Sequence, residues 1–263
     1  MTTANLLADV ANALVSGTIE VVDLTAPLGP QTPLLKLPPE VGKNTPPIEF
    51  HSISHFDKDG PFWSWKWLKI GEHSGTHFDA PIHWITGKDY ADGSTDTIPP
   101  KNFVAPAVVI DRSKEVAKNP DFLLTVEEIK NWEAEHGAVP ANHWVLFRTD
   151  WHKRNMSEAA FLNVDDKGPH SPGPTAEAIE YLLTKGVIGW GSETVGTDAG
   201  SAGGMNPPFP AHSLMHKANR YGLASLANLD RLPTKGAILI AAPLKIVGGT
   251  GSPLRVLALI AKH

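Results

Sequence analysis

The first 50 residues show two different spacings of apolar side chains. Between residues 3 and 16 these side chains fall three or four positions apart, which predicts an amphipathic helix that ends at Gly17. Between residues 18 and 24 they alternate, which predicts a strand. Residues 25–50 contain seven prolines and no helical period. We therefore expect an extended loop there, which wraps around the body of the protein or around a partner subunit.

Beyond this loop, helical and strand patterns alternate along the chain. Thr125 is a good N-cap with Glu128 at the capping-box position, so a helix is expected from there to Gly137. A second helix is expected over residues 174–185. Short apolar runs predict strands at 104–110, 144–149, 187–190, 236–245 and 254–260. This interleaving indicates an α/β protein, and no linker or repeat divides the chain, so we interpret residues 1–263 as a single domain.

The composition excludes several classes of partner. Hydrophobic residues make up 41% and charged residues 19% of the chain, which is usual for a compact protein. The formal net charge is −5 and there is no run of lysine or arginine, so nucleic acid is not expected as a partner. No apolar run is long enough to span a membrane, and the first 17 residues lack the pattern of a secretory signal. We expect a cytoplasmic protein without membrane contacts.

Candidate chemistry is concentrated in residues 73–84, which carry three histidines and one aspartate. His73 and His77 can share a helical face or converge across a turn at Gly75, and His77 and Asp79 share one face of an extended segment. Two imidazoles and a carboxylate leave coordination positions open, which is typical of a catalytic metal site. The chain has no cysteine, so thiolate sites are excluded, and the ligands suit Zn²⁺, Mn²⁺, Fe²⁺ or Co²⁺.

Two other interpretations of these ligands stay open. A mononuclear iron oxygenase also uses two histidines and one carboxylate, although its ligands usually lie on a β-barrel that this interleaved chain does not resemble. A metal-binding module without turnover would need the same ligands. A zincin protease and a serine hydrolase are disfavoured, because the chain has neither His-Glu-x-x-His nor Gly-x-Ser-x-Gly.

The segment from His73 to His83 resembles the His-x-Gly-Thr-His-x-Asp-x-Pro-x-His signature of the cyclase family. This family of metal-dependent hydrolases includes bacterial kynurenine formamidases and enzymes that open the ring of isatin. The likeness continues in the opening strand at 21–25, in His212 with 223–229, and in 243–246 and 251–255, which resemble the C-terminal strands of the family. It implies a swivelling β/β/α-like fold with a mixed β core flanked by helices.

The resemblance also implies a role for each residue that matches the motif. His73, His77 and Asp79 match the metal ligands. His83 matches the histidine that acts as acid or base, a task that suits imidazole because it titrates near neutral pH. His212 matches a further histidine on the other side of the site, where it could stabilise an oxyanion or protonate a leaving nitrogen.

One position departs from the formamidase pattern. Some formamidases hold a second metal with a glutamate at the position where this chain has Ala224. The next residue, Ser225, places a hydroxyl where it could bind substrate or water. We therefore expect one divalent metal ion, with Mn²⁺ favoured and Zn²⁺ as the alternative.

The implied reaction is hydrolysis of the lactam of isatin to isatinate by water activated at the metal. The alternative is an arylformamidase that acts on N-formylkynurenine. The aromatic run before the motif favours the first of these. As partners, we expect a small aromatic cyclic amide as the substrate and a second copy of the chain in a homodimer, formed through the N-terminal helix and the proline-rich loop.

Aromatic side chains surround the motif in sequence and suit a flat bicyclic substrate. Phe62, Trp63 and Trp84 are the expected pocket wall. Trp65 and Trp67 share a strand face with Trp63 and are expected in the core. Phe62 lies on the opposite face of a regular strand from Trp63, so both can line one pocket only if the strand begins irregularly.

Overall fold

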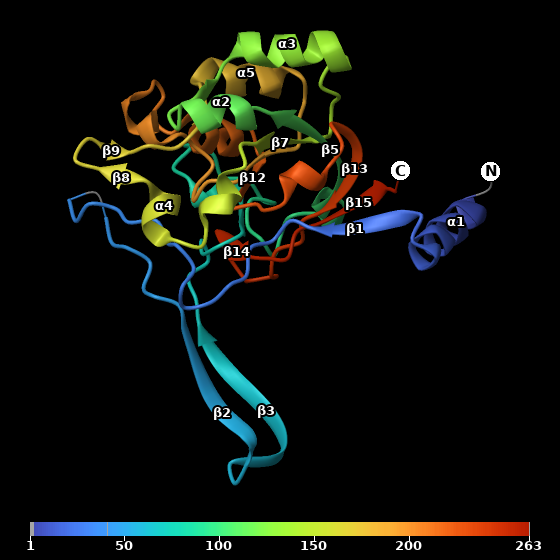
Figure 1. Ribbon diagram of the computed structural model, residues 1–263, viewed down its shortest axis with the longest axis vertical. Helices are drawn as coiled ribbons and strands as arrows, with labels where there is room; N and C mark the ends of the chain where they lie inside the picture. Colours follow the sequence, from blue (N-terminus) through green and yellow to red (C-terminus); the bar gives the residue numbers. More distant parts are fainter. Residues whose placement is uncertain (1–2, 41, 263) are drawn as a thin grey trace.

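A mixed nine-stranded sheet forms the body of the protein in a computed structural model, which describes residues 3–40 and 42–262 (Figure 1). The strand order is β1-β15-β13-β5-β7-β11-β12-β4-β14. In this order the strands span Ile19–Asp23, Leu257–Ala261, Lys235–Ile240, Val104–Asp111, Trp144–Arg148, Gly189–Ser192, Tyr221–Ala224, His77–Asp79 and Gly251–Pro253. The central strands β5, β7, β11 and β12 run parallel, and the outer pairs are antiparallel. The α/β architecture with a mixed β core is therefore confirmed.

The alternation of side chains along β5 builds two apolar cores, one on each face of the sheet. Val108 and Ile110 point to one face, where they join side chains of helices α3 and α5. Val109 points to the other face and belongs to a second core. This second core also contains Val22 from one end of the sheet and Phe78 from the other end. The sheet therefore curls, so that its two ends enclose common apolar side chains.

Few helices accompany the sheet, and α2, α3 and α5 lie together on one side of it (Figure 1). The helices span Thr3–Ser16 (α1), Ser113–Lys118 (α2), Val126–His136 (α3), Glu158–Leu162 (α4) and Ala176–Thr184 (α5). Small strand pairs are β6 (Leu123–Leu124) with β10 (Gly173–Pro174), and β8 (Val164–Asp165) with β9 (Gly168–Pro169). Single 3₁₀ turns lie at Pro81–His83, Pro100–Phe103, Trp151–Arg154, Gly200–Gly204 and Leu229–Arg231, and a π-helix lies at Ala211–Met215. Within the described residues, no helix combines the length and the apolar character needed to cross a membrane.

Both predicted inner helices form, with small differences at their first turns. The Thr125 hydroxyl accepts a hydrogen bond from the Glu128 N–H, as predicted for the cap of α3. The Glu128 carboxylate pairs with Arg112 instead of completing the capping box. Helix α5 begins at Ala176 and not at residue 174, because the Thr175 hydroxyl caps it by accepting from the N–H of residue 178.

The predicted strands are found, but three of their boundaries were wrong. The strand expected at 187–190 lies at Gly189–Ser192, and the one expected at 236–245 ends at Ile240. The run expected at 254–260 begins only at Leu257, and residues 254–256 separate it from β14, which the periodicity did not predict but which lies in the segment 251–255 that resembles a strand of the family. The reason is topological: β14 pairs with β4, whereas β15 pairs with β1 and β13 in another part of the sheet.

Strands β2 (Glu49–Asp57) and β3 (Gly60–Lys69) pair only with each other and form an arm that extends away from the body (Figure 1). Trp65 and Trp67, expected in the core, are 55% and 49% exposed. This expectation was wrong because the strand that carries them joins no other sheet. Phe62 is 85% exposed and Trp63 is 50% exposed, so the arm presents its aromatic side chains to solvent.

The N-terminal helix and the loop after β1 also lie at the surface. Helix α1 confirms the predicted helix at 3–16 and ends at Gly17, whose φ of 73° lies in the left-handed region. Its Leu7 and Val15 are 71% and 90% exposed. Between β1 and β2, the described residues contain no helix or strand, apart from an isolated bridge between Thr25 and Leu226, as predicted for a proline-rich loop.

Candidate metal and catalytic site

Strand β4 carries the central residues of the motif and lies between β12 and β14. Gly75 precedes it with a φ of 61°, a conformation that favours glycine and turns the chain into the strand. Thr76 holds the turn in place, because its hydroxyl donates to the Ser225 carbonyl at 2.6 Å. His77 and Asp79 then leave the strand on the same face, and both are buried.

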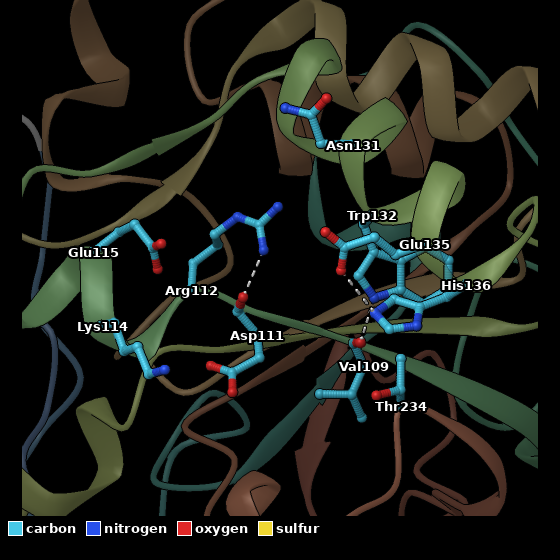
Figure 2. A pocket seen from close by; sticks show the side chains of 10 residues that line it. All are labelled: Val109, Asp111, Arg112, Lys114, Glu115, Asn131, Trp132, Glu135, His136 and Thr234. Carbon is cyan, nitrogen blue, oxygen red and sulfur yellow. Dashed lines mark hydrogen bonds and ion pairs between the residues drawn. The ribbon is translucent and has the colours of Figure 1, made fainter.

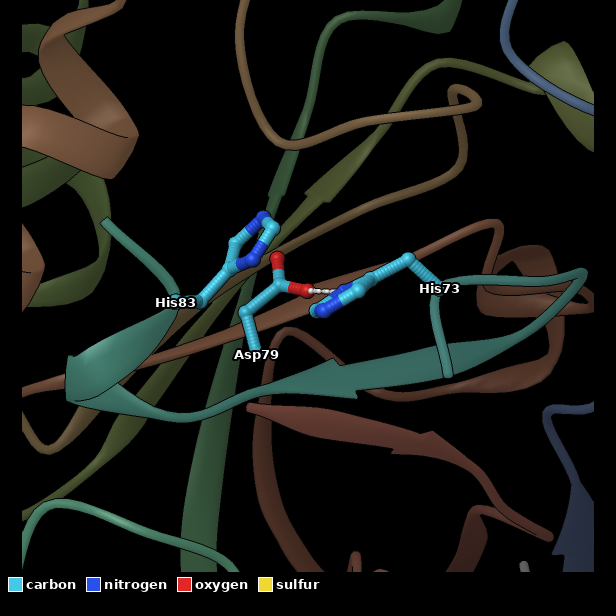
Figure 3. A group of neighbouring side chains, drawn as sticks. All are labelled: His73, Asp79 and His83. Atoms are coloured by element: carbon cyan, nitrogen blue, oxygen red, sulfur yellow. Dashed lines mark hydrogen bonds and ion pairs between the residues drawn. The ribbon is translucent and has the colours of Figure 1, made fainter. Parts of the chain in front are cut away.

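Asp79 is the centre of the site, and its carboxylate is fully buried. Its Oδ1 lies 2.8 Å from His73 Nδ1 (Figure 3). The same oxygen lies 3.3 Å from His77 Nε2. Its Oδ2 has no hydrogen-bond partner among the described residues. Burial alone raises the pKa of Asp79, but the neighbouring side chains of His77 and His73 outweigh burial and hold the pKa well below its usual value. A buried carboxylate in this state favours a positive charge beside it.

The orientation of His77 is fixed by the turn that precedes it. Its Nδ1 lies 2.8 Å from the Gly75 carbonyl, which can only accept, so Nδ1 carries the proton. The Nε2 lone pair is therefore free to face Asp79. A metal-binding histidine usually donates one ring N–H to a backbone carbonyl or carboxylate and binds the metal with the other nitrogen, and His77 has this arrangement.

Figure 3 shows His83 beside the same carboxylate. Within the described residues, the donor atoms that all lie within 4.8 Å of one another belong to His73, Asp79 and His83. This group differs from the set predicted from the sequence, which has His77 in place of His83. The 3.3 Å contact of His77 with Asp79 nevertheless brings all four side chains to one place.

His83 lies at the end of a 3₁₀ turn, Pro81–His83, directly after β4. Its ring stacks on that of His73, with centroids 3.7 Å apart and an angle of 25° between the planes. Burial lowers the pKa of His83 to about 3, although the charge of Asp79 opposes this shift. His83 is therefore a neutral imidazole at physiological pH.

His212 approaches Asp79 from the opposite side, on the π-helix Ala211–Met215. Its Nδ1 pairs with the carboxylate of Asp198, and its Nε2 lies 3.9 Å from Asp79 Oδ2. Asp198 also accepts from the N–H of Ala211 at 2.6 Å, so one carboxylate anchors both the helix and the imidazole. Burial lowers the pKa of His212, but Asp198 outweighs burial, and the net pKa is raised. Sequence reasoning missed Asp198.

His216 is a second residue of the site that sequence reasoning missed. It is 1% exposed, and its ring lies 6.1 Å from His83 and 5.8 Å from His212. Its Nδ1 donates to the Arg220 carbonyl at 3.0 Å, which leaves a buried Nε2 without a partner among the described residues. Burial lowers the pKa of His216 to about 4. The spacing of four between His212 and His216 was a usable sequence signal, because it places both on one side of a helical segment.

The expected aromatic wall is split between two places. Trp84 lies in the site, 4.8 Å from His212 between ring centroids. Phe209, which the sequence did not suggest, packs beside Trp84 at 5.6 Å. Phe62 and Trp63 lie on the exposed arm, so this chain does not bring them to its own histidines.

Residues 224 and 225 lie beside the motif, because β12, which ends at Ala224, pairs with β4. Ala224 is the direct partner of His77 in the β4–β12 pair, so it lies where the sequence placed it, beside the candidate metal ligands. Ser225 is buried next to it with a φ of 52°. Its hydroxyl donates to the Thr194 carbonyl at 3.3 Å. A contact of this hydroxyl with substrate stays a prediction.

A cavity of about 510 Å³ lies elsewhere, beside α2, α3 and the end of β5 (Figure 2). Its lining includes Arg112, Lys114 and His136 but none of the site residues predicted from the sequence. The convergence of buried histidines on one carboxylate is the stronger sign of chemistry, because such groups are costly to bury without a task.

Comparison with known proteins gives consistent results. A family model described as "Putative cyclase" matches residues 22–199. Isatin hydrolase of Roseibium aggregatum is 64% identical over 262 residues, which cover 100% of both chains. Kynurenine formamidase of Salinibacter ruber is 31% identical over 191 residues, 72% of this chain and 76% of that relative. A crystal structure of an isatin hydrolase bound to the product analogue thioisatinate matches with a TM-score of 0.98 and 64% identity, again over 100% of both chains.

Proposed function

Because the chain belongs to the cyclase family, we propose that it is a metal-dependent hydrolase that opens the lactam ring of isatin to isatinate. The observation that carries this proposal is the likeness to isatin hydrolase over the whole chain, in sequence and in fold. The buried donor groups around Asp79 support it, because they lie in the part of the chain that the family shares.

We infer that His73, His77 and Asp79 hold one divalent metal ion. The residues fit such an ion, because Asp79 Oδ2 is buried without a hydrogen-bond partner among the described residues and an ionised oxygen in that position needs a cation. The nitrogen and oxygen ligands suit Mn²⁺, which we favour, and Zn²⁺ as the alternative. A divalent ion bound there lowers the pKa of its water and polarises a carbonyl. Ala224 offers no further carboxylate, which supports one ion and not two.

His83 is placed to take a proton during the attack of water on the lactam carbon. Its neutral state leaves a nitrogen lone pair that can accept a proton, and burial makes this nitrogen a weaker base than a free imidazole. The stack on His73 fixes the plane of its ring, so that the lone pair has a defined direction. We assign His83 as the residue that accepts this proton.

His212 is placed for the opposite task. Asp198 holds its Nδ1 and favours the protonated ring, so Nε2–H points into the site as a donor. When the C–N bond breaks, the nitrogen of the former lactam must take up a proton. We assign His212 as the residue that supplies it, or that stabilises the negative oxygen formed earlier.

The exposed arm supports a homodimer. A two-stranded hairpin is only marginally stable alone in water, and this arm exposes aromatic rings from both of its strands. In a twofold dimer each arm meets the same surface of the other copy. We propose that Phe62 and Trp63 contribute to the substrate pocket of the second copy, while Trp84 serves the pocket of its own chain.

Hydrolysis of N-formylkynurenine is the second candidate, and the similarity to kynurenine formamidase supports it. Both reactions cleave the amide bond of an aniline nitrogen. The decisive measurement is turnover of isatin and of N-formylkynurenine by the same preparation, after metal removal and after addition of Mn²⁺ or Zn²⁺. Faster turnover of the formamide would overturn the choice of isatin.

A further inference from the structure

His73 has hydrogen-bond partners on both ring nitrogens, and one of these partners belongs to a chain of groups. Its Nδ1 lies 2.8 Å from Asp79 Oδ1, and its Nε2 lies 2.9 Å from the hydroxyl of Thr250. The same hydroxyl donates to Glu72 Oε2 at 2.6 Å. Glu72, Thr250 and His73 therefore form a continuous line that ends at the candidate metal ligands.

The direction of each hydrogen bond in this line follows from the number of protons that each group carries. A hydroxyl has one proton, and the carboxylate of Glu72 can only accept. The Thr250 proton therefore goes to Glu72, in a short charge-assisted bond. The Thr250 oxygen must then accept from His73, so the Nε2 of His73 carries a proton.

This assignment decides what His73 presents to Asp79. With the proton on Nε2, Nδ1 of the neutral ring has a lone pair that faces Asp79 Oδ1 at 2.8 Å. Two lone pairs at this separation repel each other unless a proton or a metal ion lies between them, and with a neutral ring only a metal ion can fill this place. His77 likewise presents the lone pair of Nε2 to the same oxygen, at 3.3 Å. The arrangement is therefore set for a shared cation.

The backbone holds Thr250 in register with the metal-binding strand. Its carbonyl accepts from the Ala80 N–H at 2.9 Å, and its own N–H lies 3.4 Å from Glu72 Oε2. The next residue, Gly251, pairs with Asp79 between β14 and β4. Thr250 is thus fixed by the same strand pair that fixes the carboxylate.

We infer that Thr250 and Glu72 are positioning residues that make His73 a metal ligand through Nδ1, by holding the proton on Nε2. This inference rests on the proposed metal-dependent function but concerns metal binding alone. Groups that orient a metal-binding histidine typically contribute 10- to 100-fold to metal affinity.

The test compares three variants by metal titration of the metal-free protein with Mn²⁺ and Zn²⁺. Thr250→Val removes the hydroxyl at nearly constant volume and is expected to weaken binding about 10- to 100-fold. Thr250→Ser keeps the hydroxyl and is expected to bind within about threefold of the wild type, on the scale of the same effect. Thr95→Val is the matched control, since Thr95 is a buried threonine that donates to the Ile246 carbonyl at 3.0 Å.

A spectroscopic measurement separates positioning from general damage. In the Zn²⁺-loaded protein, ¹⁵N NMR of the histidine rings, assigned with His73→Asn, should show Nδ1 of His73 on the metal and Nε2 protonated. Thr250→Val should shift this pattern toward the other nitrogen. The wild-type spectrum is decisive even if Thr250→Val fails to fold.

Three results would overturn the inference: wild-type protein with Nε2 on the metal or with no bound metal, Thr250→Val with unchanged affinity, or Thr250→Ser as weak as Thr250→Val. None of these readouts requires substrate. A protein whose metal affinity depends on the Thr250 hydroxyl but that does not hydrolyse isatin would overturn the proposed function and leave this inference standing.

Discussion

Gly251 lies against the ring of His73. A Cβ added at residue 251 would lie 2.4 Å from His73 Cε1 and 2.4 Å from the Phe78 carbonyl oxygen. Because a backbone atom blocks one side, the ring of His73 would have to move. The lack of a side chain at residue 251 is therefore part of the geometry of the site.

We expect Gly251→Ala to weaken metal binding at least 10-fold, by displacing a ligand, and to cost about 1–3 kcal/mol in stability through overpacking. Metal titration and urea denaturation measure the two effects. Gly204→Ala is the control, since a Cβ added at residue 204 would meet only open space. Equal metal affinity in both variants would contradict the role of Gly251.

Asp79→Asn tests whether the buried carboxylate is the main attraction for a cation. Free metal at 100 times its dissociation constant should stabilise the wild type by about 2.7 kcal/mol. The variant keeps the shape of the side chain but loses its charge, so we expect metal to leave its unfolding free energy unchanged. Denaturation with and without metal measures this, and an equal gain in the variant would refute it.

The low pKa of His216 predicts a pH dependence of stability in the metal-free protein. Burial lowers this pKa from 6.5 to about 4 in the folded state. Between these values the unfolded chain binds more protons, so stability falls as pH falls, by up to about 1.4 kcal/mol per pH unit. His216→Asn keeps a donor for the Arg220 carbonyl and removes the titrating ring. Urea denaturation from pH 7.5 to pH 5 should show a shallower decline in the variant, and parallel declines would contradict this.

Asp198→Asn tests the pairing with His212. An amide at this position can donate to Nδ1 and turn the imidazole into the wrong tautomer, as an equivalent change does in serine proteases. We expect kcat for isatin to fall about 10²- to 10⁴-fold, with metal affinity within a few-fold of the wild type. Steady-state kinetics and metal titration together check this. An unchanged kcat in the variant would contradict this role of Asp198.

The arm predicts that dimer stability depends on its aromatic side chains. Buried tryptophans at interfaces often contribute about 2 kcal/mol or more, so Trp65→Ala should weaken dimerisation about 30-fold. Sedimentation across a range of protein concentrations measures this. Met156, which is 94% exposed and lies outside the arm, provides the control Met156→Ala. A wild-type protein that sediments as a monomer would refute the proposed dimer.

The sequence predicted the regular elements well where periodicity and caps agreed. Thr125 and Gly137 set the ends of α3 as expected, because capping is a local interaction. Strand β14 followed from the family resemblance but not from periodicity, since three residues carry no usable period and their pairing with β4 depends on distant parts of the chain. Trp65 was misplaced for the same reason: a strand shows which residues share a face, but not whether another layer covers that face.

The residues of the candidate site likewise fall into those that the sequence could predict and those that it could not. His73, His77, Asp79 and His83 lie within one short segment, and the structure brings them together. Asp198, His216 and Thr250 reach this segment only through tertiary contacts. Their roles depend on which atom faces which, and that information is absent from spacing along the chain.

The position of β4 between β12 and β14 also sets the order of events during synthesis. Asp79 leaves the ribosome early, but the strands on both sides of it begin only at Tyr221 and Gly251. At about 5–20 residues per second, Gly251 follows Asp79 by roughly 10–30 s. Until then the segment that carries Asp79 has no β14 to pair with and no Thr250 to orient His73. We therefore expect the proposed metal site to be completed only after synthesis has passed Thr250 and Gly251.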